Sequence, residues 1–168
     1  MTFSLRFIEE NDLDFVTEIR KDPEVAENLG TFLLLSKEKQ KIWFDNLIVD
    51  RTRMYLIFEK NDISIGYVRM SEIDYVNRSI CVGGDIHKNY RGKGYGHEMY
   101  DFILNLCFDQ LNMNRVWLFV LESNKRAKHL YQKHGFKEEG KQRQAIYRNG
   151  KYIDYIMMSI LKDEFHKL

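Results

Sequence analysis

The stretch HKNYRGKGYGHEMY, residues 87–100, places glycines at every second position, at Gly92, Gly94 and Gly96. Glycine weakens a helix or strand by roughly 0.5–1 kcal/mol relative to alanine, so the cluster indicates an unusual backbone shape or the close approach of another group. Apolar residues at helical spacing begin just after it, at residue 95. A glycine turn that enters a helix presents successive backbone N–H groups to a phosphate or diphosphate.

Two common phosphate-binding motifs do not fit this turn. A P-loop needs Gly-Lys-Ser/Thr, but Tyr95 follows Gly94. The dinucleotide fingerprint needs a glycine at position 97, which is His97. What remains is Arg-x-x-Gly-x-Gly, matched by Arg91, Gly94 and Gly96.

The elements expected before the turn are two helices and four strands. A strand is predicted at residues 3–8, followed by a helix capped by Asn11 or Asp12 and ended by Pro23. A second helix should begin near Ser36, because an apolar stripe follows at helical spacing. Its members are Ile42, Trp43, Leu47 and Ile48. Residues 54–60, 63–73 and 78–86 then predict three strands of an antiparallel meander.

The elements expected after the turn alternate between helix and strand. A helix begins at Tyr95, and the apolar run at residues 116–121 is typical of a strand covered on both faces. A further helix is capped by Ser123 or Asn124 and stopped by Gly135. Two strands, at 136–147 and 151–161, flank the hairpin signal Asn149-Gly150. This order predicts an α/β (α+β) fold with a central, largely antiparallel sheet.

Composition narrows the class of protein. The 168 residues, 44% of them hydrophobic, fit one domain spanning residues 1–168. With 26 basic and 25 acidic residues the net charge is +1, which argues against nucleic acid or an anionic membrane as a partner. Cys81 and Cys107 form no CxxC pair and are expected to be reduced and buried. Without an apolar stretch of about 18 residues, the chain is expected to be cytoplasmic.

A second motif agrees with the first in order and spacing. NKRAKHLYQKHGF, residues 124–136, is similar to the Asn-x-x-Ala-x-x-Leu-Tyr-x-x-x-Gly-Phe segment of the GCN5-related N-acetyltransferase (GNAT) family, whose glycine loop also has the Arg-x-x-Gly-x-Gly pattern. The resemblance covers almost the whole chain and looks like the branch of ribosomal-protein N-terminal, spermidine and amino-sugar acetyltransferases. It implies a mostly antiparallel sheet, flanked by about four helices and splayed between the strands before and after the loop.

The resemblance also implies acetyl-CoA as cosubstrate, no metal, and a set of cofactor-binding residues. Gly84, Asp85 and Ile86 would pair with the pantetheine arm as if it were another strand. Taken by itself, Gly83-Gly84 inside a strand predicts either a bulge or a close approach. The loop would offer its backbone N–H groups to the pyrophosphate. The full cofactor set is Gly84, Asp85, Ile86, Arg91, Gly92, Lys93, Gly94, Tyr95, Gly96 and Asn124.

Catalytic roles follow from the same resemblance. Tyr131 would protonate the leaving thiolate as general acid, although a helical tyrosine four residues after Ala127 also fits a core position. Some relatives place a basic glutamate where this chain has Phe119. Glu72 matches a glutamate of the polyamine branch and is the candidate base, with Asp85 a weaker one. The two histidines beside the loop, His87 and His97, are expected in a loop and on a helix surface.

The identity of the acceptor amine is the feature that the sequence determines least. Polyamine enzymes of this type carry acidic residues between the first two helices, whereas this chain has NLGTFLLLS, residues 28–36. That segment suits a sugar nucleotide, an aromatic amine or a peptide terminus better than a polyamine, and it fits core packing equally well. The expected acceptor is a primary amine of a small metabolite or amino sugar nucleotide, with a protein N-terminus or a polyamine as the alternative. The partner would be a small-molecule or peptide amine, and a homodimer stays open. Two other classes remain, a non-catalytic acetyl-CoA-binding regulatory module and a nucleotide-binding interaction domain.

Overall fold

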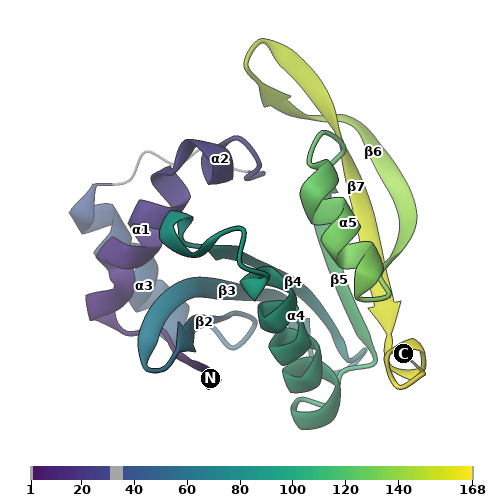
Figure 1. The fold of residues 1–168 in the computed structure, drawn as a ribbon, viewed down its shortest axis with the longest axis horizontal. Coiled ribbons are helices and arrows are strands. Elements are labelled where there is room, and N and C mark those ends of the chain that lie inside the picture. Colours follow the sequence, from purple (N-terminus) through teal and green to yellow (C-terminus); the bar gives the residue numbers. More distant parts are fainter. Residues whose placement is uncertain (1, 31–35, 168) are drawn as a thin grey trace.

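The structure is a computed structural model that describes residues 2–30 and 36–167. Within these ranges, seven strands form one sheet in the order β1-β2-β3-β4-β5-β7-β6 (Figure 1). Their bounds are β1 (Phe3–Phe7), β2 (Met54–Lys60), β3 (Ile63–Asp74), β4 (Ser79–Ile86), β5 (Arg115–Leu121), β6 (Lys137–Arg148) and β7 (Lys151–Leu161). Neighbouring strands are antiparallel except for β4 and β5, which run parallel. The predicted mixed, mostly antiparallel sheet is confirmed.

Four helices of two turns or more flank the sheet in the described part of the chain, and two further helices have four residues each. The longer ones are α1 (Leu13–Lys21), α3 (Lys37–Val49), α4 (Tyr95–Asn105) and α5 (Lys125–Lys133), and the short ones are α2 (Pro23–Ala26) and α6 (Lys162–Phe165). A π-helical segment, Leu106–Gln110, continues α4. These helices agree with the four that the sequence predicts.

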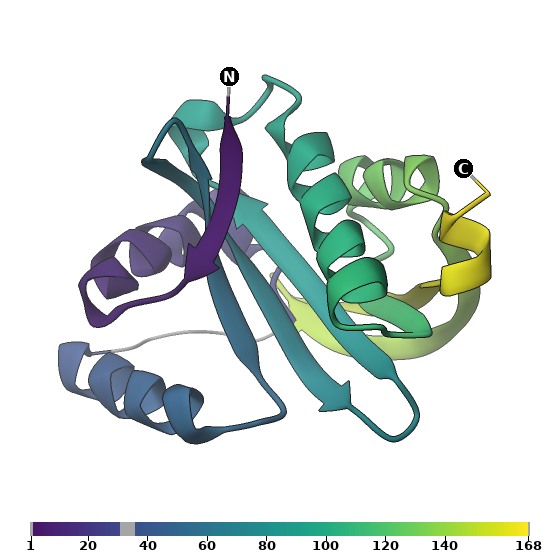
Figure 2. The ribbon, with the colours of Figure 1, turned by 90° about the horizontal axis from the view of Figure 1, so that it is seen from below.

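The first half of the sheet is a meander with an apolar layer on each face. Because strand side chains alternate between faces, Phe58 packs on one side and its neighbour Ile57 on the other, and both are fully buried. The face of Ile57 is covered by α1 and α3, and the face of Phe58 by α4 (Figure 2). The two layers hold the meander in a fixed position against α4, which begins at the glycine loop.

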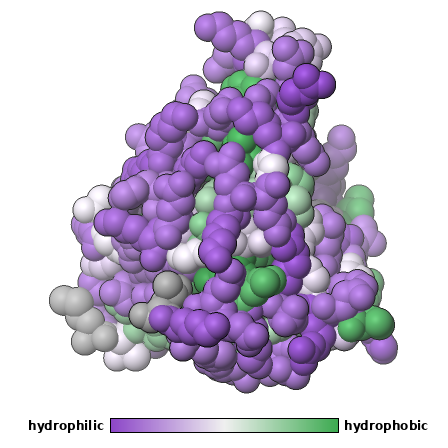
Figure 3. Space-filling view, turned by 90° about the vertical axis from the view of Figure 1, so that its right-hand side faces the viewer, coloured by the Kyte–Doolittle hydropathy of each residue, from purple (hydrophilic) through white to green (hydrophobic). Residues whose placement is uncertain are grey.

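The second half of the sheet comes from the last two strands and β5. The β6–β7 hairpin turns at Asn149 and Gly150, with φ values of +47° and +80°, as the Asn-Gly signal predicts. Most residues of β6 are exposed. The face of the molecule that carries this hairpin is largely hydrophilic (Figure 3). No helix in the described part of the chain has the length and apolar character to span a bilayer.

Two local expectations need correction. In α3, Leu47 is buried as expected, but Ile42 and Ile48 are 60% and 62% exposed and Phe44 is buried instead, so the packed face is rotated from the expected stripe. The end of the first helix before Pro23 is confirmed, because α1 stops at Lys21, and Pro23 then begins α2, where its missing N–H costs nothing. Strand β5 is not buried on both faces, because alternate side chains on one face stay half-buried.

Candidate functional site

The sheet opens between β4 and β5. These two strands pair only through Ser79–Cys81 and Arg115–Trp117, after which they diverge (Figure 1). A cleft of about 650 Å³ lies in the opening, lined by the ends of both strands, by α4 and α5, and by residues 24–30. This volume is in the range of small-molecule and cofactor sites. The predicted splay is therefore present, and the cleft lies within it.

Strand β4 packs closely against β3 and α4 at Gly84. A Cβ atom at Gly84 would lie 2.8 Å from the Met99 side chain and 2.9 Å from the backbone oxygen of Tyr67. The β3–β4 pairing stays in register through this part of both strands. There is therefore no bulge at Gly83-Gly84, and the close approach found at Gly84 is that of the protein's own Met99 and Tyr67. The approach of a cofactor chain at this place stays a prediction.

The glycine loop leaves open space at the N-terminus of α4. Gly92 and Gly94 have φ values of +75° and +81°, and no atom lies within 4 Å of the position of a Cβ at either residue. No side chain caps the helix. The backbone N–H groups of Gly94, Tyr95 and Gly96 donate no hydrogen bond to the described residues. An uncapped helix N-terminus with free amides in front of an open cradle fits a diphosphate.

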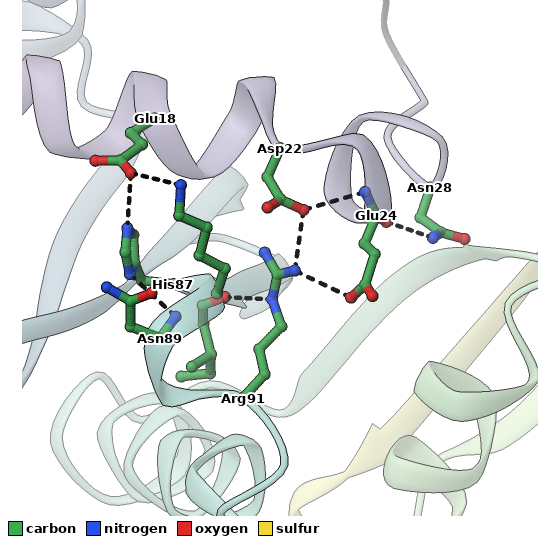
Figure 4. Close-up of polar contacts among 9 residues, drawn as sticks. Glu18, Asp22, Glu24, Asn28, His87, Asn89 and Arg91 are labelled. Carbon is green, nitrogen blue, oxygen red and sulfur yellow. Dashed lines mark hydrogen bonds and ion pairs between the residues drawn. The ribbon is translucent and has the colours of Figure 1, made fainter.

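The side chain of Arg91 points out of this cradle. Its Nε donates to the backbone oxygen of Ile86 at 2.9 Å, and its Nη1 lies 2.9 Å from Asp22 Oδ1 and 3.0 Å from Glu24 Oε2 (Figure 4). Burial opposes the ionisation of Asp22, but Arg91 holds the pKa of Asp22 below its ordinary value. Arg91 therefore fixes the loop to the N-terminal helices and leaves the cradle to the backbone amides.

Helix α5 forms the opposite wall. Asn124 caps it, since its Oδ1 accepts from the backbone N–H of Ala127 at 3.0 Å. Two turns later Tyr131 lines the cleft, with its ring centroid 5.1 Å from that of Tyr100 on α4. Burial raises the pKa of Tyr131 to about 12. A phenol with this pKa is protonated at neutral pH, and the same burial makes it a weaker acid than a free tyrosine.

Most of the predicted site residues meet at the cleft. Those that line it are Gly84, Asp85, Ile86, Arg91, Gly92, Gly94, Tyr95, Gly96, Asn124 and Tyr131. Lys93 does not line it, because its Nζ donates to the backbone oxygen of Asn89. Glu72 is exposed at an irregularity of β3, with φ +50°, and lies outside the cleft. Asp85, which lines the cleft, is therefore better placed than Glu72 to meet an acceptor.

The histidines beside the loop differ in their surroundings. His87 is buried, and its Nδ1 accepts from the N–H of Asn89, which agrees with a loop position. His97 is half-buried rather than on the surface: it lines the cleft, and its Nδ1 lies 3.2 Å from Nε2 of His134. Burial, which is the main cause, lowers the pKa of His134 below its usual range.

The cleft also contains residues that the sequence analysis did not select. These residues include Arg69, Phe119 and Tyr155. The rings of Phe119 and Tyr155 are stacked, with centroids 4.8 Å apart. A signal for Arg69 was present, because it is the one charged residue within the apolar run SIGYVRM. The described residues contain no group of three histidine, cysteine or acidic side chains able to hold a metal ion.

The segment thought to face the acceptor is only partly described. Residues 31–35 of NLGTFLLLS lie outside the described ranges. Leu29 and Gly30 line the cleft, and a Cβ at Gly30 would lie 2.8 Å from the hydroxyl of Tyr155. This part of the cleft is thus bounded by Tyr155 and by the end of the segment at Leu29 and Gly30.

Comparisons with known proteins agree with this geometry. A family model described as an acetyltransferase (GNAT) domain matches residues 3–137. The chain is 29% identical over 167 residues to the spermidine N(1)-acetyltransferase of Vibrio cholerae, with 96% of this chain and 94% of the relative covered. It is 25% identical over 164 residues, covering 86% and 90%, to YdaF of Bacillus subtilis, which is provisionally described as a ribosomal N-acetyltransferase.

A solved structure extends the likeness to the whole fold. The crystal structure of spermidine N-acetyltransferase from Vibrio cholerae in complex with CoA and spermine has a TM-score of 0.93 at 27% identity, with 98% of both chains covered. The family model alone spans most of the present chain. The protein therefore belongs to the GNAT acetyltransferase family and is an acetyl-CoA-dependent N-acetyltransferase.

Proposed function

We propose that this protein acetylates the primary amine of a small metabolite or amino sugar nucleotide by direct attack, without an acetylated enzyme intermediate. The observation that carries the proposal is the position of Tyr131, which lines the cleft on the side opposite β4, with its ring against that of Tyr100. A proton donor placed there serves a reaction in which a thiolate leaves.

Each part of the cleft has a role in this reaction. Acetyl-CoA supplies a thioester, whose carbonyl carbon forms a bond to the amine nitrogen while its bond to sulfur breaks. The amides of the loop, including Gly94 and Gly96, bind the diphosphate, and the backbone of β4 from Gly84 to Ile86, which β5 does not pair with, receives the pantetheine arm. The acceptor's ammonium first loses a proton through water to the bulk solvent, and the neutral amine attacks. Tyr131 donates its proton to the departing sulfur, and the second proton released by the nitrogen restores the phenol through water. A general acid of this kind contributes about 10²–10⁴-fold.

The charges in the cleft favour this acceptor over a polyamine. The acidic residues that line it are Glu24, Glu27 and Asp85, and Glu24 is already paired with Arg91. Arg69 and Arg126 line the same cleft. A polycation needs an acidic surface, and these mixed charges do not supply one. Acetylation of a polyamine, the activity named for the Vibrio cholerae relative, and of a protein N-terminus are the alternatives.

The test replaces Tyr131 with phenylalanine. Release of free thiol from acetyl-CoA is measured against panels of amino sugars, polyamines and peptides, and binding of acetyl-CoA is measured by calorimetry. Because only the hydroxyl is removed, kcat should fall about 10²–10⁴-fold with little change in cofactor affinity. Tyr152→Phe, which alters a 65% exposed ring at the hairpin tip, is the matched control.

Two results would contradict the proposal. If Tyr131→Phe turns over as fast as the unchanged protein, Tyr131 is not the general acid. If the unchanged protein binds acetyl-CoA but acetylates no amine on any panel, the chain is a non-catalytic binding module.

A further inference from the structure

The guanidinium of Arg69 is a cation in the lining of the cleft that has no hydrogen-bond or ion-pair partner among the described residues. Arg69 is half-buried, and its Nε is enclosed with no hydrogen-bond partner among the described residues. No carboxylate of residues 2–30 or 36–167 lies within ion-pair distance of it. Arg91, which also lines the cleft, differs because two carboxylates neutralise it.

An unpaired guanidinium in this position is costly to the free protein. Arginine keeps its charge at any physiological pH, so it cannot avoid the cost by losing a proton. Removing an ion from water is unfavourable unless a partner replaces the water. A group that enters the cleft and accepts hydrogen bonds would provide that partner.

The neighbouring strand holds Arg69 where an acceptor would meet the thioester. Arg69 is paired with Gly83 across β3 and β4, and its Nη2 lies 2.7 Å from the position of a Cβ at Gly83. The guanidinium therefore occupies the space that a side chain at position 83 would take. The next residue, Gly84, belongs to the part of β4 proposed to pair with the pantetheine arm. Arg69 is thus one strand position from the proposed path of the pantetheine arm.

Asp85 forms no ion pair with Arg69, although both residues line the cleft. Tyr67 is paired with Asp85 and Arg69 with Gly83, so the two charged residues project from the same face of the sheet. Oδ2 of Asp85 is also enclosed without a partner, yet no ion pair joins the two side chains. A cation and an anion held apart in one cleft match a ligand that carries both an anionic and a cationic group.

We propose that Arg69 binds an anionic group of the acceptor, a carboxylate or a phosphate, while the acceptor's amine lies toward Asp85 and Tyr131. Arg69 is then a specificity-determining residue, and the preferred substrates are anionic amines. The planar fork of arginine suits both oxygen groups. The stacked rings of Phe119 and Tyr155 bound the same space and can hold the body of the molecule. This inference rests on the proposed function.

The first test compares acceptors that differ only in the anion. Acetyl transfer is measured with L-phenylalanine against phenethylamine, with glucosamine 6-phosphate against glucosamine, and with spermidine. The anionic member of at least one pair should have a kcat/KM at least tenfold higher, and the pair that responds identifies the anion as a carboxylate or a phosphate. Arg69→Met should remove the preference mainly by raising KM, and Arg69→Lys should keep part of it. Arg143→Met, at an exposed position of β6, should change nothing.

A second test needs no turnover. Replacing an unpaired, enclosed cation by methionine should stabilise the ligand-free protein, with Tm rising by about 2–4 °C per kcal/mol gained. Phenylacetate or glucose 6-phosphate, added to the CoA-bound protein, should raise the Tm of the unchanged chain and not that of Arg69→Met. This result is expected even if no amine is acetylated, so it separates a failure of this inference from a failure of the proposed function.

Three outcomes would overturn the inference. The first is a preference for spermidine or the neutral amines that Arg69→Met leaves intact. The second is a lower Tm for ligand-free Arg69→Met, which would mean that the guanidinium holds the fold together. The third is equal stabilisation of both proteins by the two anions.

Discussion

Arg91 shows how one side chain can serve a site without entering it. Its guanidinium turns toward Asp22 and Glu24, and so it connects the loop before α4 with the turn between α1 and α2 (Figure 4). The Arg-x-x-Gly-x-Gly motif therefore contains two kinds of residue. The arginine anchors the loop, and the glycines give it the left-handed backbone at Gly92 and Gly94.

Gly94→Val is predicted to abolish acetyl-CoA binding, because the new side chain occupies the open cradle in front of α4. The substitution also strains a left-handed residue, so a control must share that strain. Gly150→Val provides it, since Gly150 has φ +80° and equally open surroundings at the distant hairpin turn. Calorimetry with acetyl-CoA should show binding by Gly150→Val and none by Gly94→Val. Equal binding by both would contradict the loop assignment.

At the scale of elements, β4 is the strand on which the site depends. It pairs with β3 along most of its length but with β5 only at Ser79–Cys81, so its second half forms a wall of the cleft. The second half is also where glycines allow close packing. Gly66 on β3 and Gly84 on β4 each face a backbone oxygen within 3 Å of a Cβ position.

Gly84→Ala is predicted to destabilise the fold by about 1–3 kcal/mol, the usual range for overpacking. The methionine side chain near the new Cβ can move, but the backbone oxygen of Tyr67, at 2.9 Å, can move only if β3 and β4 separate. Urea unfolding measures the change. Gly140→Ala on exposed β6 is the control, because nothing lies within 4 Å of its Cβ position. Equal urea midpoints for the two variants would show that the packing around Gly84 is looser than these distances indicate.

At the scale of the molecule, two half-sheets meet along one short parallel contact. The meander β1–β4 has an apolar layer on each face, and the layer on the α4 face continues over β5 and β7. Helix α5 lies beside this second half of the sheet (Figure 1). The cleft exists because the halves diverge beyond residue pair Cys81–Trp117. Both halves also contain thiol or phenol groups that are at least partly buried and have no charge partner. These groups make the stability of the whole fold sensitive to alkaline pH.

The protein is predicted to lose stability above about pH 9. Burial raises the pKa values of Cys81 to about 11, and of Cys107 and Tyr131 to about 12, from ordinary values of 9.0 for the thiols and 10.0 for the phenol. The folded state therefore keeps protons that the unfolded state releases. Their contribution is complete below the unfolded values and is lost as the pH rises toward the folded ones.

Calorimetric Tm values at pH 7–11 measure this effect. The Tm should be nearly constant to about pH 8.5 and should then fall. Cys107→Ala should have a lower Tm at pH 7 and a shallower decline above pH 9. A Tm that stays constant to pH 11 would show that these groups are not enclosed in solution.

The sequence predicted the order of elements because their signals are local. The Asn149-Gly150 turn, the cap at Asn124 and the helix stop at Gly135 each depend on a few adjacent residues. The errors occur where packing decides. Ile42 and Ile48 have helical spacing, but which side of α3 is buried depends on its neighbours, and these select Phe44 and Leu47.

By itself, the sequence determined the family, the cofactor and the backbone of the loop, since two motifs and the glycine positions contain that information. Only the tertiary structure decided which charged residues share the cleft. It excludes Glu72 from the lining residues, turns Arg91 outward, and places Arg69 and Asp85 together without a mutual ion pair. The physical reason is that strand register and the splay between β4 and β5 set these distances, and both depend on contacts between residues far apart in the chain.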